Sequence, residues 1–546
     1  MKNQAIYIII AAVLCLSVNM QAQHNHENNH RNSNHDRHKS VLVAPSVGGI
    51  YYEFLDTTAT IIQGPHGFKY VGDIVIPNSV KYGGKTYSVT RIGNSSFAYC
   101  NELKSITIPN SVQSIGNTAF YQCYDLTSIN IPESVTNIGE RAFEFCISLT
   151  SINVESENKN YSSEDGVLFN KDKTILMLCP REKTGKYIIP SSVTEIEESA
   201  FYECKGLTSI DIPKSVTSIG RAAFMRCSGI TSIDIPKKIK SIGTNTFHGC
   251  SGLTSINIPF GITDIGDNAF GWCSGATFIN IPNSVTRIKD NAFRGCKGIT
   301  SITIPASVTS IGTTVFTSCN NLTSINVESG NQNYSSDNGV LFNKDKTTII
   351  CFPGGKKGDY IIPNNVTNIG KFAFYYCSAI TSIVIPNSVK SIEEDAFSYC
   401  EGLTSIIIFS PNLVGHHLID NNMNENCIIR VPTNAISRYK NDFTWKKYTI
   451  EDNGQTIYSL SVTHNDSQGG ITIYKESDTS QIVTLTATAN SGYKFLSWAI
   501  RKNLPRSGYN PYNFTEIKDI VVSKKNPYTF TLTEDVELIA KFQKKE

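Results

Sequence analysis

The chain has 546 residues, of which 40% are hydrophobic and 18% charged, which is the composition of a folded protein with rather few charges. Its 49 lysines and arginines nearly balance its 47 acidic residues and leave a formal net charge of +2. Such a balance provides no electrostatic basis for binding nucleic acid or an anionic membrane, so we expect neither as a partner.

The first segment predicts export. A lysine at position 2 precedes an apolar run from Ala5 to Val18, and the small residue Ala22 follows at a plausible cleavage position. This arrangement is typical of a secretory signal peptide, and the run is too short to span a bilayer comfortably. We therefore predict a signal peptide over residues 1–22 and a secreted or cell-surface location in a bacterium. After removal of the signal, we expect no membrane-spanning segment.

Residues 23–40 form a histidine-rich leader. Five of the ten histidines of the chain lie here, among asparagine, arginine and aspartate. A segment this polar cannot bury a core, and we predict that it is disordered. Histidine-rich tracts also bind metal ions, so a weak metal-binding role stays open as the alternative.

From residue 41 to 452 the chain repeats itself. Cysteines recur at one constant interval, at positions 100, 123 and 146, and again from position 204 to position 319. One unit reads LTSINIPESVTNIGERAFEFC, from Leu126 to Cys146. Self-similarity at a short fixed period is the signature of a solenoid, in which each coil covers the apolar side of its neighbour.

The spacing inside the unit predicts its local structure. Ile129 and Ile131 lie on either side of Asn130, so a strand directs both isoleucines inward and the asparagine outward. Pro132 has no N–H to donate to a ladder, so the strand should end there. Gly139 suits a sharp bend. The unit therefore predicts one coil, in which a short strand is followed by turns.

Two insertions interrupt the period. The strand-ending prolines keep the interval of the cysteines except after Pro132, where the next one is Pro190, and after Pro305, where the next one is Pro363. Both long intervals contain GVLFNKDKT, which places a polar turn between apolar runs, so we predict a hairpin in each insertion. The whole block recurs, with GVLFNKDKT beginning at position 166 in one copy and at position 339 in the other. This recurrence indicates the duplication of a segment of several coils.

Together these motifs resemble the BspA-like leucine-rich repeat proteins, also called the Treponema pallidum type. The resemblance rests on the 23-residue unit, the two GVLFNKDKT insertions, the entry segment GDIVIP from Gly72, and the exit segment from Val431 to Trp445. It covers about residues 50–450. It implies a curved solenoid and a surface or secreted protein, with adhesion or host-protein binding in some members, but it names no ligand.

The period vanishes after residue 453, and apolar and polar residues alternate instead, as in half-buried strands. The segment GYKFLSW from Gly492 resembles the divergent internalin-type B-repeat modules, which are small β-grasp-like domains of bacterial surface proteins. We predict such a domain over residues 453–546. The predicted fold class is mainly β: a leucine-rich-repeat-type β-solenoid of 23-residue coils followed by a small β-rich domain.

Fifteen cysteines in an exported protein raise the question of disulfides. Those that recur at one phase should stack as a column of small buried side chains, so we predict a reduced ladder. The redox states of Cys179, Cys351 and Cys427, which lie outside the ladder, stay open. No CxxC pair is present to indicate a metal site.

Motifs of catalysis are also missing from the sequence. It contains no HExxH, no Walker phosphate loop and no GxSxG elbow. We therefore predict a non-enzymatic protein without cofactor, catalytic residues or metal.

The outward positions of the strands form two polar columns, one of serine and one of asparagine, aspartate and threonine. Phe278 replaces a serine in the first column, and Val384 and Ile407 make the last coils of the second column apolar. Aromatic side chains on a polar surface are typical of binding hot spots, although a solvated sheet face is the alternative for any single residue. The candidate partner-binding residues are Phe278, Asn280, Asn257, Asp234, Asp211, Trp272 and Phe260.

The predicted function is adhesion or protein–protein recognition through the solenoid face. A glycan-binding surface protein, in which the serine and asparagine columns and the aromatic residues hold a sugar, is the alternative. An enzyme with its active site in residues 456–546 is a third hypothesis that no motif supports.

Overall fold

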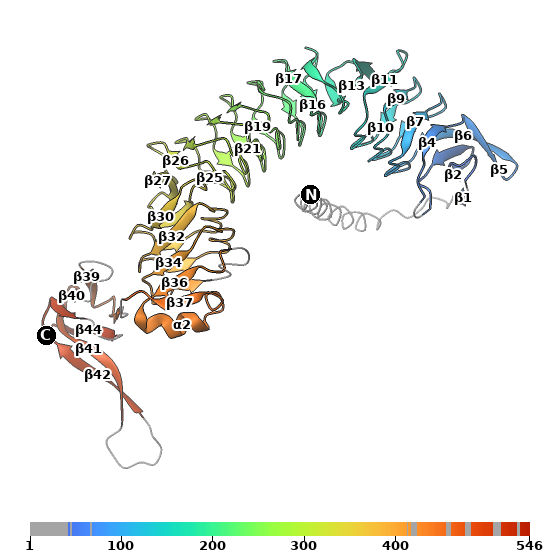
Figure 1. Ribbon diagram of the computed structural model, residues 1–546. Helices are drawn as coiled ribbons and strands as arrows, with labels where there is room; N and C mark the ends of the chain where they lie inside the picture. Colours follow the sequence, from blue (N-terminus) through green and yellow to red (C-terminus); the bar gives the residue numbers. More distant parts are fainter. Residues whose placement is uncertain are drawn as a thin grey trace.

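The computed structural model describes residues 42–43, 46–65, 68–411, 413–415, 423–454, 460–475, 482–505, 515–531 and 536–545. The predicted signal peptide and leader lie outside these residues. The repeats wind into a curved solenoid that sweeps from the N-terminal cap to a short C-terminal helix (Figure 1). Among the described residues, no helix has the length and apolar character needed to cross a membrane.

The first strand of each coil contributes to one face, which we call the strand face. These strands pair in parallel with their neighbours, for example Ser128 with Ser151 and Ile129 with Ile152. Where a repeat proline follows, the strand ends before it, as predicted from the missing N–H. The strands are β4 (Gly72–Val75), β7 (Leu103–Thr107), β9 (Ser128–Ile131), β11 (Ser151–Val154), β15 (Gly185–Ile188), β17 (Leu207–Asp211), β20 (Ser255–Asn257), β22 (Phe278–Asn280), β24 (Ser301–Ile304), β26 (Ser324–Val327), β30 (Gly358–Ile361), β32 (Ile380–Ile385), β34 (Ser405–Ile408), β36 (Ile428–Val431) and β37 (Thr449–Asp452).

A second parallel ladder runs along the coil through two-residue strands. In most of them a polar residue precedes an isoleucine that points into the core. They are β8 (Ser114–Ile115), β10 (Asn137–Ile138), β16 (Glu195–Ile196), β18 (Ser218–Ile219), β19 (Ser241–Ile242), β21 (Asp264–Ile265), β23 (Arg287–Ile288), β25 (Ser310–Ile311), β31 (Asn368–Ile369), β33 (Ser391–Ile392) and β35 (Val414–Gly415).

Between the second strand and the cysteine, each coil forms what we call the turn ladder. Alternate N–H groups bond to the next coil, as Phe97 N does to Ala119 O at 2.8 Å, while those between them close turns within the coil. This alternation puts two residues of each turn ladder at positive φ, for example Ser95 at 54° and Tyr99 at 64°. The stacked turns therefore supply a third line of hydrogen bonds between coils.

The core consists of columns of identical residues. From Phe201 to Phe316, one phenylalanine per coil stacks on the next with nearly parallel rings and centroid distances from 5.0 to 6.1 Å. Most ladder cysteines donate their thiol hydrogen to the phenylalanine carbonyl of the preceding coil, as Cys227 does to Phe201 at 2.9 Å. A cysteine thus both fills space and satisfies a buried carbonyl.

The cysteine prediction is confirmed. All fourteen described cysteines are free, and all but the half-buried Cys351 are buried. Cys179 and Cys427, whose state the sequence left open, are also free thiols. Burial raises the pKa of the Cys250 thiol to about 12, so this thiol stays protonated and unreactive at neutral pH.

Gly139 is required for a reason that differs from the predicted bend. A Cβ on this residue would lie 2.4 Å from the backbone nitrogen of Asn117 in the preceding coil. Close approach of two coils therefore excludes a side chain, and its backbone is not left-handed.

Both insertions form the predicted hairpins. The first contains β12 (Tyr161–Glu164), β13 (Val167–Asn170) and β14 (Ile175–Leu178), which pair antiparallel in that order. The second contains β27 (Tyr334–Asp337), β28 (Val340–Asn343) and β29 (Thr348–Cys351) in the same arrangement. After each hairpin the second ladder resumes, through β16 and β31 respectively.

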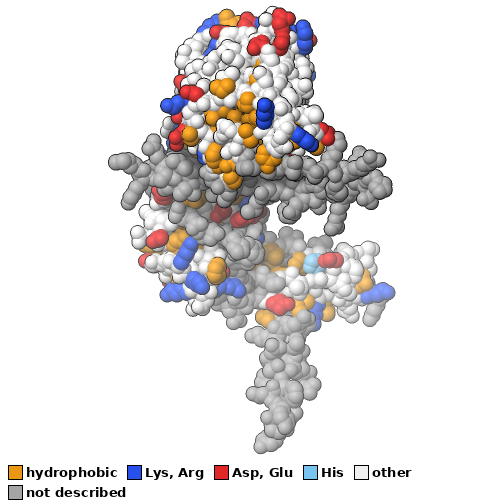
Figure 2. Space-filling model, turned by 90° about the vertical axis from the view of Figure 1, so that its right-hand side faces the viewer, with side chains coloured by type: hydrophobic (Ala, Val, Ile, Leu, Met, Phe, Trp, Pro, Cys, Tyr) orange, Lys and Arg blue, Asp and Glu red, His pale blue; other side chains and the backbone are white. Residues whose placement is uncertain are grey.

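The N-terminal cap covers the first coil with β1 (Leu42–Val43), β2 (Tyr52–Leu55), β3 (Thr58–Ile61), β5 (Ser79–Tyr82) and β6 (Lys85–Ile92). Viewed from this end, the near surface carries hydrophobic side chains interspersed with charged ones (Figure 2). At the other end, η1 (Thr433–Ala435) and α2 (Ile436–Asn441) close the core, with Trp445 fully buried.

The C-terminal residues form two further sheets. One has the order β38-β44-β41-β42 and the other β39-β40-β43. Trp498 is fully buried in their shared core, and its indole N–H donates to Lys525 O at 3.1 Å. The strands are β38 (Leu460–Thr463), β39 (Gly469–Lys475), β40 (Ile482–Ala489), β41 (Tyr493–Pro505), β42 (Thr515–Ser523), β43 (Tyr528–Thr531) and β44 (Val536–Lys544).

Candidate partner-binding surface

The strand face presents the two outward columns that the sequence predicts. Pairing in register places Ser255 beside Phe278 and Asn257 beside Asn280 on neighbouring strands β20 and β22. The isoleucine between the two outward residues of each strand is buried. The two-residue period of the strand therefore decides which residues point outward and to which of the two columns they belong.

Phe278 is 57% exposed on β22, in a column where its neighbours are serines. It makes no ring or cation contact with another described residue. Nothing in the packing of the coil requires an aromatic side chain at this position. An aromatic side chain exposed on a polar face is typical of a binding hot spot.

The polar candidates lie in the other outward column. Asp211, Asp234, Asn257 and Asn280 are all exposed. Asp211 forms an ion pair with Lys186 on the preceding strand, with 2.8 Å between Nζ and Oδ2. This part of the face therefore offers carboxylate and amide groups beside Phe278.

Trp272 belongs to a different ladder from Phe278. It occupies a left-handed position of the turn ladder with φ of 60°, where the neighbouring coils carry Gly249 and Gly295. A Cβ on Gly295 would lie 2.8 Å from the indole ring, so the ring covers that glycine. Lys297 lies over the same ring at 5.7 Å. Contacts with the neighbouring coil thus explain why the indole of Trp272 is half-buried.

Phe260 lies in the turn that follows β20, directly after Pro259, and its side chain is 74% exposed. The adjacent Gly261 has φ of 106° and donates its N–H to Ser284 Oγ at 3.0 Å. The seven candidates therefore divide into a strand-face group around Phe278, a turn residue and a turn-ladder residue.

The sequence analysis missed the first residue of an apolar row further along the strand face. Ile361 on β30, Val384 on β32 and Ile407 on β34 lie in register, and Ile361 is 70% exposed. Ile361 keeps the 23-residue interval to Val384 but is separated by the second insertion from the preceding coil, where the column was not continued. Its counterpart in the first copy of the duplicated block, Ile188, is also exposed. A comparison of the two copies in the sequence would therefore have identified Ile361 as an apolar position of the outward column.

A carboxylate flanks this apolar row. Asp359 accepts hydrogen bonds from Ser382 Oγ at 2.7 Å and Thr381 Oγ1 at 2.9 Å. These two bonds lower the pKa of Asp359, so it is ionised throughout the physiological range. Within the described part of the chain, no group of three histidine, cysteine or acidic residues has the geometry to hold a metal ion.

Comparison with known families agrees with this architecture. A model described as the BspA type leucine rich repeat region matches residues 73–171, 181–274, 263–357 and 350–459, which is well over half of the chain. The chain belongs to the BspA-type leucine-rich repeat family. A second model, the divergent InlB B-repeat domain, matches residues 458–504 in the C-terminal sheets. Both resemblances drawn from the sequence are thereby confirmed.

Solved structures of bacterial leucine-rich repeat proteins also match. A leucine-rich cell surface protein from Faecalibacterium prausnitzii is 26% identical over 76% of this chain and 95% of its own, with a TM-score of 0.36. A leucine-rich repeat protein from Bacteroides ovatus is 22% identical over 77% and 99%, with a TM-score of 0.35. The T. pallidum leucine-rich repeat protein is 17% identical over 53% and 91%, with a TM-score of 0.18. No curated protein matches.

Family membership indicates a recognition role. BspA-type proteins are bacterial surface proteins whose repeats are typically non-enzymatic recognition scaffolds. The coarse prediction of a binding protein therefore agrees with the family, while its partner and its binding residues remain predictions.

Proposed function

We propose that this protein is an exported, non-enzymatic surface protein that binds a protein partner on its strand face, with Phe278 at the centre of the contact. The observation that carries the proposal is an aromatic ring exposed in a column of serines. A ring held on a regular sheet loses little conformational entropy on binding, so most of its buried area contributes to affinity.

The polar groups around Phe278 would orient the bound partner through hydrogen bonds and charge. Asn257 and Asn280 offer amide donors and acceptors, and Asp211 and Asp234 offer carboxylates along the same column. Phe260 and Trp272 lie on other elements of the same coils and enter the proposal as flanking contacts. Repetition along the solenoid extends the surface over several strands, which suits a folded protein partner.

A glycan is the second candidate ligand. The observation that favours it is the pairing of an exposed ring with neighbouring amides at Asn257 and Asn280, since sugars bind through stacking and amide hydrogen bonds. This alternative needs fewer contacts than a protein interface.

The test uses the full-length chain. A glycan array and a crosslinking screen on intact cells with a membrane-impermeant reagent identify candidate ligands, and each is then titrated against purified protein. Phe278→Ser restores the serine of the column and should weaken binding by about tenfold or more without changing the melting temperature. Phe443→Ser removes another exposed ring, outside the strand face, and should leave binding unchanged. Equal affinity of Phe278→Ser and the natural chain would reject this site.

A further inference from the structure

The first insertion interrupts the turn ladder and leaves hydrogen-bond donors without acceptors. In continuous coils, alternate N–H groups bond to the following coil, as Gln122 N does to Glu144 O at 3.0 Å. The equivalent N–H groups of Arg141, Phe143 and Phe145 have no acceptor among the described residues. The insertion displaces the coil that would provide one. Three backbone donors thus lie along an open edge.

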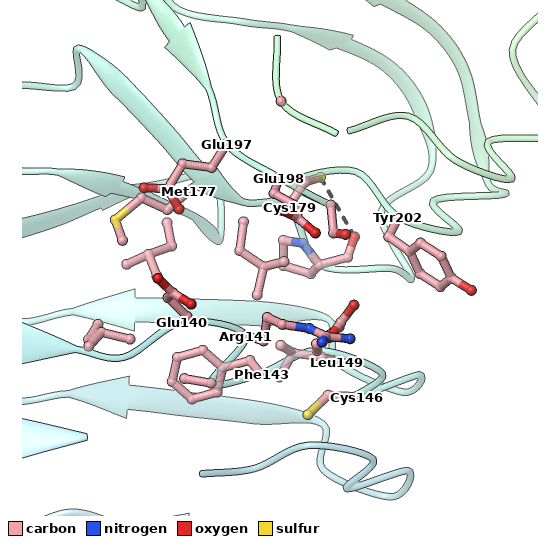
Figure 3. Close-up of a pocket in the computed structure, with 18 of the residues that line it drawn as sticks. Glu140, Arg141, Phe143, Cys146, Leu149, Met177, Cys179, Glu197, Glu198 and Tyr202 are labelled. Atoms are coloured by element: carbon pink, nitrogen blue, oxygen red, sulfur yellow. Dashed lines mark hydrogen bonds and ion pairs between the residues drawn. The ribbon is translucent and has the colours of Figure 1, made fainter. Parts of the chain in front are cut away.

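These donors line a cavity of about 400 Å³ between the coil that ends at Cys146 and the coil that follows the insertion. Figure 3 shows Glu140 and Phe143 on one wall and Met177, Cys179 and Glu197 on the opposite wall. The apolar part of the lining comprises Phe143, Leu149, Leu168, Met177, Leu178 and Ile196. The volume lies within the range of small-molecule sites in proteins.

Acidic groups dominate the charge of the lining. Five carboxylates line the cavity, and the two cations are Arg141 and Arg181. Arg141 pairs with Glu144, and Arg181 Nη1 pairs with Glu203 at 3.1 Å. The remaining four carboxylates have no ion pair with any described residue; they belong to Glu140, Glu195, Glu197 and Glu198. The cavity is therefore complementary to a cation.

Arg181 offers one more donor. Its guanidinium lies between the rings of Phe145 and Tyr202, at 5.1 and 4.6 Å from their centroids, and its side chain is only 9% exposed. Nη2 has no hydrogen-bond partner among the described residues. A buried guanidinium N–H without an acceptor is costly, and a ligand carbonyl would satisfy it.

The second insertion shows that the volume and the charge of this cavity are not imposed by the fold. Its junction holds a cavity of only about 120 Å³, because Phe352 stands where the first junction has Cys179. The acidic residues are replaced as well: Thr313, Thr317, Asn368, Gly370 and Lys371 occupy the positions of Glu140, Glu144, Glu195, Glu197 and Glu198. Duplication thus provides a matched junction that lacks both the volume and the charge.

We propose that the cavity at the first insertion is a second binding site, separate from the strand face, which takes a lysine or arginine side chain of an extended peptide segment. The aliphatic part of the side chain lies on the apolar lining, and the cationic group reaches the carboxylates of Glu197 and Glu198. The flanking peptide carbonyls accept hydrogen bonds from the N–H groups of Phe143 and Phe145, in place of the missing coil.

The probe for this site is the peptide acetyl-Gly-Ser-Lys-Ser-Gly-amide, compared with its norleucine counterpart, which keeps the aliphatic part and lacks the charge. Both are titrated against the full-length protein by saturation-transfer NMR. The lysine peptide should bind at least about tenfold more tightly than the norleucine peptide. Equal binding of the two peptides, or no binding of the lysine peptide up to about 10 mM, would overturn the proposal.

Substitutions test whether the lysine peptide binds in this cavity. Cys179→Phe introduces the ring found at the second junction and should abolish binding while the protein stays folded. The double variant Glu197→Gln, Glu198→Gln keeps the volume and should weaken binding by about tenfold. Lys371→Gln at the second junction and Phe278→Ser on the strand face should change nothing. Retained affinity in both Cys179→Phe and the glutamine double variant would refute the site, whatever the outcome on the strand face.

Discussion

The two insertions begin from nearly the same sequence and end in different junctions. Both continue the core through an identical hairpin, and both leave three turn-ladder donors open. At the first junction a buried arginine pairs with Glu203, while at the second Phe352 stacks on Phe374 at 4.9 Å. Residues that build the backbone were retained after duplication, whereas residues that face the gap between coils diverged. The difference indicates that one junction serves stability and the other is available for a ligand.

The largest effect should come from making the second junction resemble the first. Phe352→Cys removes a buried ring that stacks on Phe374 and contacts the tilted ring of Tyr360. We expect the free energy of unfolding to fall by about 3 kcal/mol, through lost burial and the remaining cavity. Urea denaturation measures the change, with Phe443→Cys at an exposed position as the control. A loss below about 1 kcal/mol would show that the ring does not hold this junction.

The second prediction concerns the ion pairs of Glu203 at the first junction. Glu203 binds Arg226 Nη1 at 2.8 Å and Arg181 Nη1 at 3.1 Å, and Glu203→Gln leaves the buried Arg181 without a counter-ion. We expect a loss of about 1–3 kcal/mol in unfolding free energy at pH 7. Chemical denaturation at pH 7 provides the measurement.

The same variant has a defined pH dependence. Burial acts to raise the pKa of Glu203, but the hydrogen bond from Arg226 and the charge of Arg181 outweigh it and hold the pKa below its ordinary value. Ionised Glu203 therefore stabilises the fold above the ordinary glutamate pKa, and this contribution disappears as pH falls through the lowered pKa. The natural chain and Glu203→Gln should therefore converge in stability as pH falls through the lowered pKa. A difference that stays constant over the whole acid range in which the protein remains folded would contradict this assignment.

The smallest effect concerns the empty cavity itself. Burial, and to a smaller extent the charge of Glu195, raises the pKa of Glu197. The folded state then holds this proton more tightly than the unfolded state, so its contribution to stability is present below the ordinary glutamate pKa and is lost as pH rises through the raised pKa. Glu197→Gln should stabilise the ligand-free protein at pH 7 by a few tenths of a kcal/mol. Thermal melts at pH 7 check the direction, with the exposed Glu102→Gln as a control expected to show no change.

Much of the solenoid was predictable because one residue type returns at one phase. The column of Cys100, Cys123 and Cys146 indicated a buried ladder, and the recurrent pair of alternate isoleucines indicated a strand with two outward columns. Phe278 was found because it breaks such a column. Trp272 was grouped with it by nearness in sequence, although the two residues occupy different ladders. The exposed strand position that follows the second insertion was missed because the insertion separates it from the preceding coil, although it keeps the interval to the following coil.

What the sequence by itself determined is the stacking of coils, because an apolar side chain at a constant period has only the next coil to bury it. The cavity at the first insertion was decided by tertiary structure alone. It arises where residues from both sides of the insertion, such as Phe143 and Ile196, line one cavity together with the small side chain of Cys179. Periodicity describes how equivalent residues of adjoining coils meet, whereas this site is formed where an insertion separates two coils.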